Sequence, residues 1–347
     1  MSTRLALVMI ARDEAQGIAR ALASARPHVD RMIVLDTGSA DDTAAIAAAE
    51  GAEVHRFTWV DDFAAARNAA LALSDADWNL VLDADEWIAG GTEALAALPA
   101  GGGDVLGLVR LDNETDTPGQ EAASSWLPRV LPRGVRYEGR VHEQPIGASR
   151  SQRLALRLRH DGYTAANLAR KAGRNEALLM AELNAAPEDP YIWYQLAREH
   201  QVRGHAPQAA LCFTEALRLA PADAPWRHSL VVRAITALKA AGQLGEALDL
   251  AGAEIDRWPD SPDFYFALGD LYLECASHAP DRAETEFLPI VESAWLRCLE
   301  IGEKPDLDGA VPGRGSHMAA HNLATFYDLL GRKDEAARYH ALAAKRG

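Results

Sequence analysis

The chain has 347 residues, 48% hydrophobic and 24% charged, which is enough apolar material to bury a core in two domains of ordinary size. Its formal net charge of −15 argues against a protein that binds nucleic acid mainly through phosphate contacts, because the electrostatic contribution to binding would be unfavourable. Three widely spaced cysteines form no C-x-x-C pair, which is typical of reduced, buried thiols. The sequence shows no signal peptide and no apolar run of membrane-spanning length, so we expect a cytoplasmic protein.

The first part of the chain alternates between apolar runs and Ala-rich segments. The runs at residues 5–11, 32–35 and 78–83 predict buried strands, and the segments at 15–25 and 43–50 predict helices. Strand and helix recur with a period of about 20 to 25 residues, which predicts a mostly parallel sheet with right-handed crossovers. Further along, residues 112–125 predict a polar loop, and residues 126–131 and 135–137 predict a β pair around Pro132-Arg133-Gly134.

Two of the predicted strands end in acids. The strand at 32–35 runs into Asp36, and the strand at 78–83 runs into Asp83 and then Asp85. The carboxyl ends of parallel strands share the edge where open α/β sheets bind ligands. Two carboxylates one residue apart leave the same face of an extended chain, where they can hold Mg²⁺ or Mn²⁺. The structural alternatives are solvated acids at a strand end and, for Asp36, a turn cap through Ser39.

Two nucleotide-binding motifs are missing. No G-x-G-x-x-G follows the first strand, which argues against a dinucleotide-dependent dehydrogenase, and no G-x-x-x-x-G-K-[ST] occurs, which excludes a P-loop phosphotransferase at the level of motifs.

Four segments in this order carry a resemblance to a known family: VMIARDEA (8–15), VLDTGSADDT (34–43), WVDDFAAARN (59–68) and WNLVLDADE (78–86). Together they resemble a family 2 glycosyltransferase of the GT-A fold. The chain is most similar to the bacterial subgroup in which this domain precedes tetratricopeptide repeats, whose members include peptide S-glycosyltransferases. One departure is Arg12-Asp13, which stands where the family more often has Lys-Asn.

The resemblance implies a nucleotide-diphosphate sugar donor, with a UDP-sugar as the first choice, and Mn²⁺ or Mg²⁺ as cofactor. On this basis Asp36 would contact the base or ribose, and Arg67 would lie beside the nucleotide. Asp83 and Asp85 would hold the metal ion that bridges the two phosphates, which neutralises charge developing on the leaving group.

Structural alternatives exist for two of the basic residues. Arg67 could instead form a surface ion pair with Asp61 or Asp62. His160 ends a strand of alternating apolar and basic residues at 154–159 and matches the downstream histidine that often completes the metal shell of GT-A enzymes. A purely structural histidine is the alternative.

The segment at residues 139–144 holds the candidate base. His142 and Glu143 lie side by side after a predicted strand, so only one of them faces inward. An inverting transfer needs a base that removes the proton of the acceptor, and Glu143 is our first choice. His142 is the second, as base or further metal ligand. Arg140 is a candidate clamp for a donor phosphate, or, like Arg136, a structural partner of Glu143.

Beyond about residue 167 the strands give way to Ala/Leu-rich helices with internal repeats. We therefore expect a GT-A domain (α/β) at residues 1–165 and an all-α tetratricopeptide solenoid at 166–347. The concave face of such a solenoid binds extended or helical peptides, which favours a protein or peptide acceptor held by the repeats. Alternatively, the solenoid caps the sheet or mediates dimerisation. The repeat positions are Trp193, Leu196, Ala197, Gly204, Ala209, Phe213, Ala216 and Pro221, then Gly242 and Ala247, then Tyr265, Leu268, Gly269 and Tyr272, and finally Leu323, Ala324, Tyr327, Gly331, Ala336 and Ala343.

Taken together, the sequence predicts a metal-dependent, inverting glycosyltransferase whose acceptor is positioned in part by the repeats. The alternative is a repeat-based scaffold with a catalytically silent nucleotide-binding domain. A sugar nucleotidyltransferase is disfavoured, because residues 11–14 (ARDE) stand where that class has a Gly-rich loop with Arg and Lys.

Overall fold

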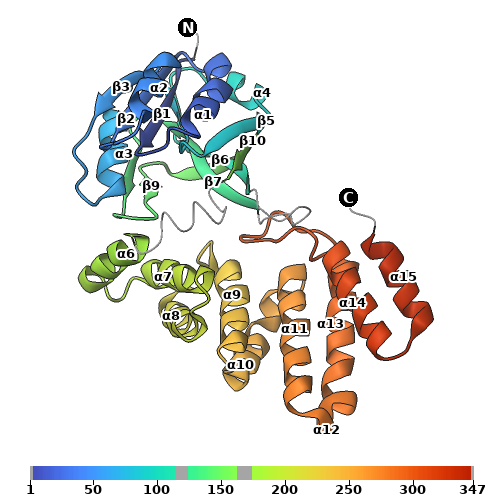
Figure 1. The fold of residues 1–347 in the computed structure, drawn as a ribbon. Helices are drawn as coiled ribbons and strands as arrows, with labels where there is room; N and C mark the ends of the chain where they lie inside the picture. Colours follow the sequence, from blue (N-terminus) through green and yellow to red (C-terminus); the bar gives the residue numbers. More distant parts are fainter. Residues whose placement is uncertain (1–2, 114–123, 162–173, 345–347) are drawn as a thin grey trace. The chain divides into compact units, whose positions relative to one another are not determined.

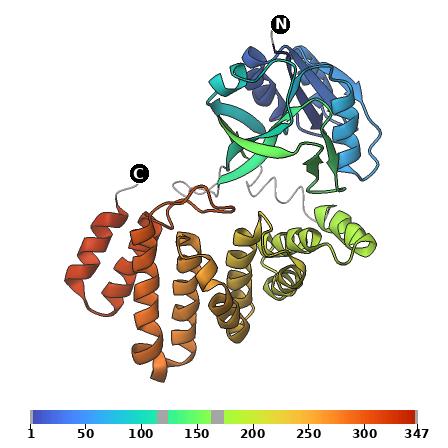
Figure 2. The ribbon, with the colours of Figure 1, turned by 180° about the vertical axis from the view of Figure 1, so that it is seen from behind.

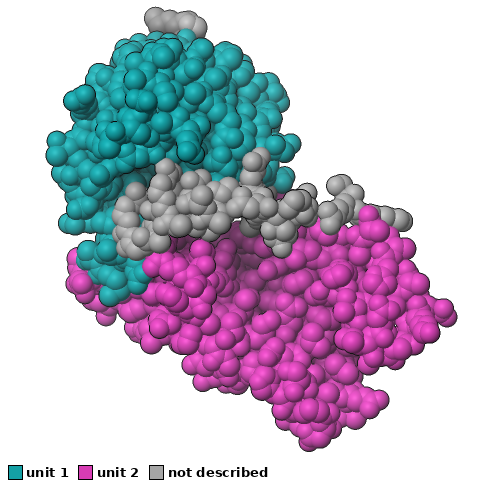
Figure 3. All heavy atoms as spheres, in the orientation of Figure 1, with its two compact units in different colours: residues 1–182 teal, residues 183–347 magenta. Residues whose placement is uncertain are grey.

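The structure is a computed structural model that describes residues 3–113, 124–161 and 174–344. The chain divides into two compact units, Met1–Glu182 and Leu183–Gly347, which are coloured separately in Figure 3. The domain boundary expected after residue 165 lies outside the described residues, as does most of the polar loop expected at 112–125.

The first unit is built around a sheet with the strand order β3-β2-β1-β4-β7-β6-β10-β5 (Figure 1). Central β1 is parallel to both β2 and β4, as the continuous apolar runs predict. Beyond β4 the sheet becomes mixed, because β7 is antiparallel to β4 and β6, and β5 is antiparallel to β10. The strands are β1 Leu5–Ala11, β2 Arg31–Asp36, β3 Glu53–Arg56, β4 Trp78–Val81, β5 Glu86–Gly90, β6 Val105–Asn113, β7 Ser124–Pro132, β8 Arg136–Glu138, β9 Gln144–Ile146 and β10 Arg150–His160.

Helices cover both faces of the parallel part of the sheet. Successive residues of β1 point to opposite faces, so Leu7 packs in a cluster with Ile18 of α1, whereas Val8 packs with Ala70 of α3. Helix α3 begins where Asp62 accepts a hydrogen bond from the backbone N–H of Ala65 at 2.8 Å. The helical segments are α1 Ile18–Ala25, η1 Arg26–His28, α2 Thr43–Ala49, α3 Phe63–Ala72, α4 Glu93–Ala96 and α6 Arg174–Ala185. The boundary between the two units falls within α6, after Glu182.

One strand pairing differs from the expectation. The sequence pattern predicted that residues 126–131 and 135–137 pair with each other across Pro132-Arg133-Gly134, and this is wrong. Instead β7 pairs with β4 and β6, and β8 forms a separate hairpin with β9. The reason is that both edges of β7 are paired, one with β4 and the other with β6, so β8 pairs with β9 instead.

The second unit consists of antiparallel helical pairs, seen from opposite sides in Figure 1 and Figure 2. The helices α7 and α8 pack together, as do α9 and α10, α11 and α13, and α14 and α15. The segments are α7 Pro190–Val202, α8 Ala206–Leu219, α9 Arg227–Ala240, α10 Leu244–Glu254, η2 Ile255–Arg257, α11 Pro262–His278, α12 Pro280–Arg282, η3 Ala283–Phe287, α13 Leu288–Ile301, α14 His317–Leu329 and α15 Lys333–Ala343.

The predicted repeat positions are packing positions within the helices and turn positions between them. Gly204, Gly242 and Gly331 lie in the turns between paired helices and have φ near +73°, +75° and +72°, which glycine adopts without a steric penalty. Gly269 lets α11 approach α13, since a Cβ there would lie 2.4 Å from Nε1 of Trp295. Within the described ranges, no helix is both long and apolar enough to cross a lipid bilayer.

Candidate active site

The carboxyl ends of β2 and β4 bring the predicted acids to one edge of the sheet. Asp36 is the last residue of β2 and pairs in register with Ala11 at the end of β1, while Asp83 follows β4 on the other side of β1. Asp36 is 6% exposed and its Oδ1 accepts hydrogen bonds from the backbone N–H of Ser39, at 3.1 Å, and from its hydroxyl. The turn cap considered as an alternative is therefore present, and the predicted contact of Asp36 with a nucleotide stays a prediction.

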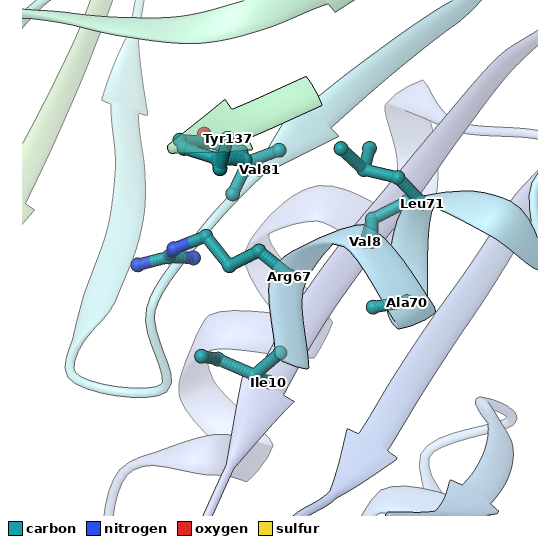
Figure 4. Close-up of a pocket in the computed structure, with 7 residues that line it drawn as sticks. All are labelled: Val8, Ile10, Arg67, Ala70, Leu71, Val81 and Tyr137. Atoms are coloured by element: carbon teal, nitrogen blue, oxygen red, sulfur yellow. The ribbon is translucent and has the colours of Figure 1, made fainter. Parts of the chain in front are cut away.

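Arg67 lies at the centre of the site. Its side chain leaves α3 between Ile10 and Tyr137, and its guanidinium extends past the apolar side chains that line the narrow gap in Figure 4. Nη2 donates to Oδ1 of Asp83 at 2.7 Å, and Nε donates to Oε1 of Glu143. The alternative pairing of Arg67 with Asp61 or Asp62 is wrong, because Arg67 is only 7% exposed and points inward.

The β8–β9 hairpin carries Glu143 to Arg67. Asn68 of α3 binds the backbone of Tyr137 twice, donating to its carbonyl at 2.9 Å and accepting from its N–H at 2.8 Å. The backbone N–H of Phe63 also donates to the carbonyl of Arg140, at 2.8 Å. These contacts hold the hairpin loop against α3, so that Glu143 meets Arg67 rather than Arg136 or Arg140, the structural partners that the sequence offered.

His142 and Arg140 occupy the same hairpin loop. His142 has a φ of +53°, a left-handed conformation that is uncommon outside glycine and asparagine. It is half-buried, and its carbonyl accepts a hydrogen bond from the side chain of Gln144 at 2.9 Å. The side chain of Arg140 is exposed. The loop therefore turns Glu143 inward and leaves Arg140 at the surface.

Asp85 and His160 form the second contact that the sequence anticipated. Nε2 of His160 lies 3.3 Å from Oδ2 of Asp85, and the backbone N–H of Asp161 donates to the carbonyl of Asp85 at 3.3 Å. β10 brings them together, because its last residue, His160, lies opposite Glu86 in the pairing with β5. The side chains of Asp85 and His160 are 9% and 14% exposed.

Both carboxylate oxygens of Asp83, by contrast, accept hydrogen bonds from arginines. Its Oδ1 is bound to Arg67, and its Oδ2 accepts a hydrogen bond from Nη2 of Arg129 at 2.9 Å. Over the ranges that the structure describes, no three His, Cys, Asp or Glu side chains are arranged as a ready metal site. The structure thus brings His160 to Asp85, and it does not bring Asp83 into the same cluster.

Three buried residues of the site were missed at the level of sequence: Arg129, Glu86 and Tyr137. Arg129 is the single charge in the segment WLPRVLP, and a lone charge in an apolar strand is a usable signal for a buried ion pair. Glu86 directly follows the D-x-D triplet as the third carboxylate at this strand end, but the sequence assigned it no role. Tyr137 gave no signal, since an aromatic residue in a short strand is usually part of the core.

Burial and the nearest opposite charges shift the pKa values of these groups in opposite directions. Burial alone would lower the pKa of Arg67, but the carboxylates of Asp83 and Glu143 raise it well above its usual value, so the guanidinium stays charged. Burial raises the pKa of Glu86, an effect that Arg129 opposes and that the neighbouring Asp83 and Asp85 reinforce. The site is a largely buried cluster in which two arginines bind three carboxylates, with Asp83 shared between them.

Such an arrangement has the chemistry to hold a divalent cation. A carboxylate with an adjacent imidazole provides hard ligands for such an ion, and the carboxyl ends of parallel strands are the edge where open α/β sheets bind ligands.

Comparison with known proteins agrees with the sequence resemblance. Residues 6–158 match the model of the family described as "Glycosyl transferase family 2". A "TPR repeat-containing protein" of Synechococcus elongatus is 34% identical over 263 residues, which cover 71% of this chain and 64% of the relative. The SPbeta prophage-derived glycosyltransferase SunS of Bacillus subtilis is 26% identical over 204 residues, covering 55% of this chain and 48% of the relative. The chain therefore spans about half to two thirds of the length of these relatives.

Among solved structures, glucosyl-3-phosphoglycerate synthase from Mycobacterium tuberculosis, in complex with Mn²⁺, UDP and glucosyl-3-phosphoglycerate, is 23% identical. The similarity covers 33% of this chain and 44% of that one, with a TM-score of 0.26. A likeness this loose transfers neither a ligand nor a residue role to this chain.

Proposed function

Because residues 6–158 belong to the family 2 glycosyltransferases, we propose that this chain is a metal-dependent, inverting glycosyltransferase that uses a nucleotide-diphosphate sugar. The observation that supports this most directly is the convergence, at one edge of the sheet, of Asp36, Asp83, Arg67 and the pair Asp85–His160. In this proposal Asp36 contacts the base or ribose, Arg67 lies beside the nucleotide, and Arg140, at the exposed loop, closes on a donor phosphate.

The proposed metal ion is Mn²⁺ or Mg²⁺, and Asp85 and His160 fit it best. Two neighbouring ligands of an octahedral ion with bonds of about 2.1 Å lie about 3 Å apart. The observed separation of 3.3 Å between Oδ2 of Asp85 and Nε2 of His160 is close to that value. Such ions usually take few protein ligands and complete their shell with water and phosphate oxygens, and when bound they neutralise charge on the diphosphate leaving group. Asp83 becomes a ligand only if it leaves its arginines.

Glu143 is the proposed base. Arg67 binds its Oε1, and its Oε2 has no hydrogen-bond partner among the described residues, so one oxygen is held while the other can accept the proton of the acceptor. In an inverting transfer this deprotonation accompanies attack on the anomeric carbon from the side opposite the diphosphate. His142 is the second candidate.

The repeats are proposed to select the acceptor. Stacked helical pairs present an extended surface of the kind that binds peptides, which favours a protein or peptide acceptor. Support also comes from the relative named for its TPR repeats, whose match extends over 71% of this chain.

Calorimetric titration with UDP and GDP, each with Mn²⁺ or with EDTA, tests the proposal. We expect at least one nucleoside diphosphate to bind in a Mn²⁺-dependent way, and the corresponding sugar donor to be hydrolysed slowly. Asp85→Ala should abolish the Mn²⁺-dependent binding, whereas the matched change at an exposed acid, Asp104→Ala, should leave it unchanged. If no nucleotide binds and no UDP- or GDP-sugar is hydrolysed, the chain acts as a repeat-based scaffold instead.

A further inference from the structure

One nitrogen atom of Arg129 joins two carboxylates of the site. Its Nη2 donates to Oδ2 of Asp83 at 2.9 Å and also to Oε1 of Glu86. Arg129 is 9% exposed and Glu86 is 2% exposed, so this half of the bridge is shielded from water, whereas the side chain of Asp83 is 33% exposed. Both bonds of the bridge come from Nη2, and Nε of Arg129 has no hydrogen-bond partner within the described ranges.

Glu86 also closes the turn formed by residues 83–86 (the acidic turn) through two hydrogen bonds with Asp83. The backbone N–H of Asp83 donates to Oε2 of Glu86 at 3.2 Å, and the backbone N–H of Glu86 donates to the carbonyl of Asp83 at 3.0 Å. Glu86 is also the first residue of β5, where it lies opposite His160 of β10. The side chain that shapes the turn is therefore attached to the strand pair that brings His160 to Asp85.

The arginine offsets a repulsion between the two carboxylates. Asp83 and Glu86 are three residues apart, Glu86 is 2% exposed and the side chain of Asp83 is 33% exposed, so two like charges lie close together at the border of the protein interior. A single cation between them removes the repulsion and sets the direction of both carboxylates. Removing one member of a buried ionic group leaves an uncompensated charge, so the turn would rearrange.

From this geometry we propose that Arg129 and Glu86 are positioning residues that hold the Asp83–Asp85 turn in the shape that receives a nucleoside diphosphate and its metal ion. The assignment rests on the proposed function, since it concerns the same site. Neither residue touches the ligand: Arg129 directs Asp83, and Glu86 sets the turn that presents Asp85 to His160.

The test compares Arg129→Lys with Arg129→Met in calorimetric titrations with UDP and Mn²⁺, or with GDP if that is the nucleotide the wild type binds. Loss of a residue that orients metal ligands typically costs about 10–100-fold in affinity, and we expect a loss of this size in Arg129→Met. Arg129→Lys should recover much of it, because one ammonium group can replace the one bridging nitrogen. A purely structural role predicts lower thermal stability for both variants with unchanged affinity.

Glu86→Gln provides a second arm that does not depend on the folding of Arg129→Met. Its amide oxygen can still accept from the N–H of Asp83, but its charge is gone, so it should weaken binding less than Arg129→Met does. Arg133→Met is the matched control, because this arginine binds the carbonyls of Asp75 and Ala76 at the opposite end of β4.

The outcomes distinguish a failure of the proposed function from a failure of the positioning role. If the wild type binds no nucleotide, the proposed function fails and this inference falls with it. If the wild type binds while Arg129→Met and Glu86→Gln both bind within twofold of it, the proposed function stands and the positioning role is wrong. A binding loss in Arg129→Lys as large as that in Arg129→Met would also overturn the single-nitrogen bridge.

Discussion

Both units bury an apolar core, but they distribute their buried charges differently. In the first unit Arg67, Arg129 and Glu86 gather around the end of β4, whereas the interior between the paired helices of the second is formed mainly by aromatic side chains such as Phe213 and Trp295 and by alanines. Buried charge contributes little net stability and is expensive to assemble, so its presence at a sheet edge points to function. Buried apolar area is the main source of stability in repeat proteins.

The contrast is not absolute, because the second unit also buries a few polar groups. Asp263 is 1% exposed and accepts hydrogen bonds from the N–H of Val311 at 2.9 Å and from Arg314 at 3.0 Å. These contacts attach the long connection between α13 and α14 to the start of α11. They connect neighbouring segments of a packed array, whereas both arginines of the first unit converge on Asp83.

The largest expected effect comes from changing the chemistry of the first unit without changing its packing. In Glu143→Gln the amide oxygen can still accept from Arg67, so nucleotide binding should persist. The rate of donor hydrolysis should fall by roughly 10²–10⁴, the usual cost of losing a general base. Glu138→Gln, an exposed change on β8, is the control. If hydrolysis survives in Glu143→Gln, the base lies elsewhere and His142 is the next residue to test.

The reciprocal experiment removes packing from the second unit. Phe213 is fully buried in α8, and Phe213→Ala should lower the free energy of unfolding by about 3–5 kcal/mol. The folded fraction should bind UDP and Mn²⁺ as the wild type does. Leu211→Ala, on the same helix at 60% exposure, should change stability by less than about 0.5 kcal/mol. Denaturant unfolding measures both, and a parallel loss of nucleotide affinity in Phe213→Ala would contradict the separation of roles.

Gly17→Ala should affect stability and site together. A Cβ at Gly17 would lie 2.7 Å from the carbonyl oxygen of Ala84 and 3.8 Å from Cα of Asp85, so α1 would press on the acidic turn. We expect a loss of about 1–3 kcal/mol in stability, with weaker Mn²⁺-dependent nucleotide binding. Gly90→Ala meets no atom within 4 Å and serves as the control. Unchanged binding in Gly17→Ala would show that the turn tolerates the displacement.

The smallest expected effect is a pH dependence in the second unit. Burial raises the pKa of Asp270 from 3.8, although Lys239 and Arg314 act in the opposite direction. A carboxyl whose pKa is higher in the folded state stabilises the fold at low pH and loses that contribution as pH rises through the folded pKa. The difference in unfolding free energy between wild type and Asp270→Asn should therefore shift against the wild type as pH rises from about 4 to about 7. A difference that is flat, or that moves the other way, would contradict the raised pKa.

Much of the fold could be predicted because it depends on local patterns. The apolar runs at β1, β2 and β4 placed those strands to within a few residues, and the glycines at 204, 242 and 331 marked the turns between paired helices. The pairing of β7 could not be predicted in the same way. A Pro-Arg-Gly sequence between two β-forming segments is compatible with a hairpin, and only the gap between β4 and β6 decides otherwise.

By itself, the sequence determined which acids end the strands, because a continuous apolar run followed by Asp36 or by Asp83 is encoded within a few neighbouring residues. It also placed His160 at the end of its strand and Glu143 in a loop. The tertiary structure decided the partners of these groups. Arg67 and Glu143 are 76 residues apart and meet because Asn68 and Phe63 hold a hairpin against α3, while Arg129 reaches Asp83 and Glu86 across neighbouring strands. Contacts over such separations depend on which surfaces pack together, and no local pattern of residues contains that information.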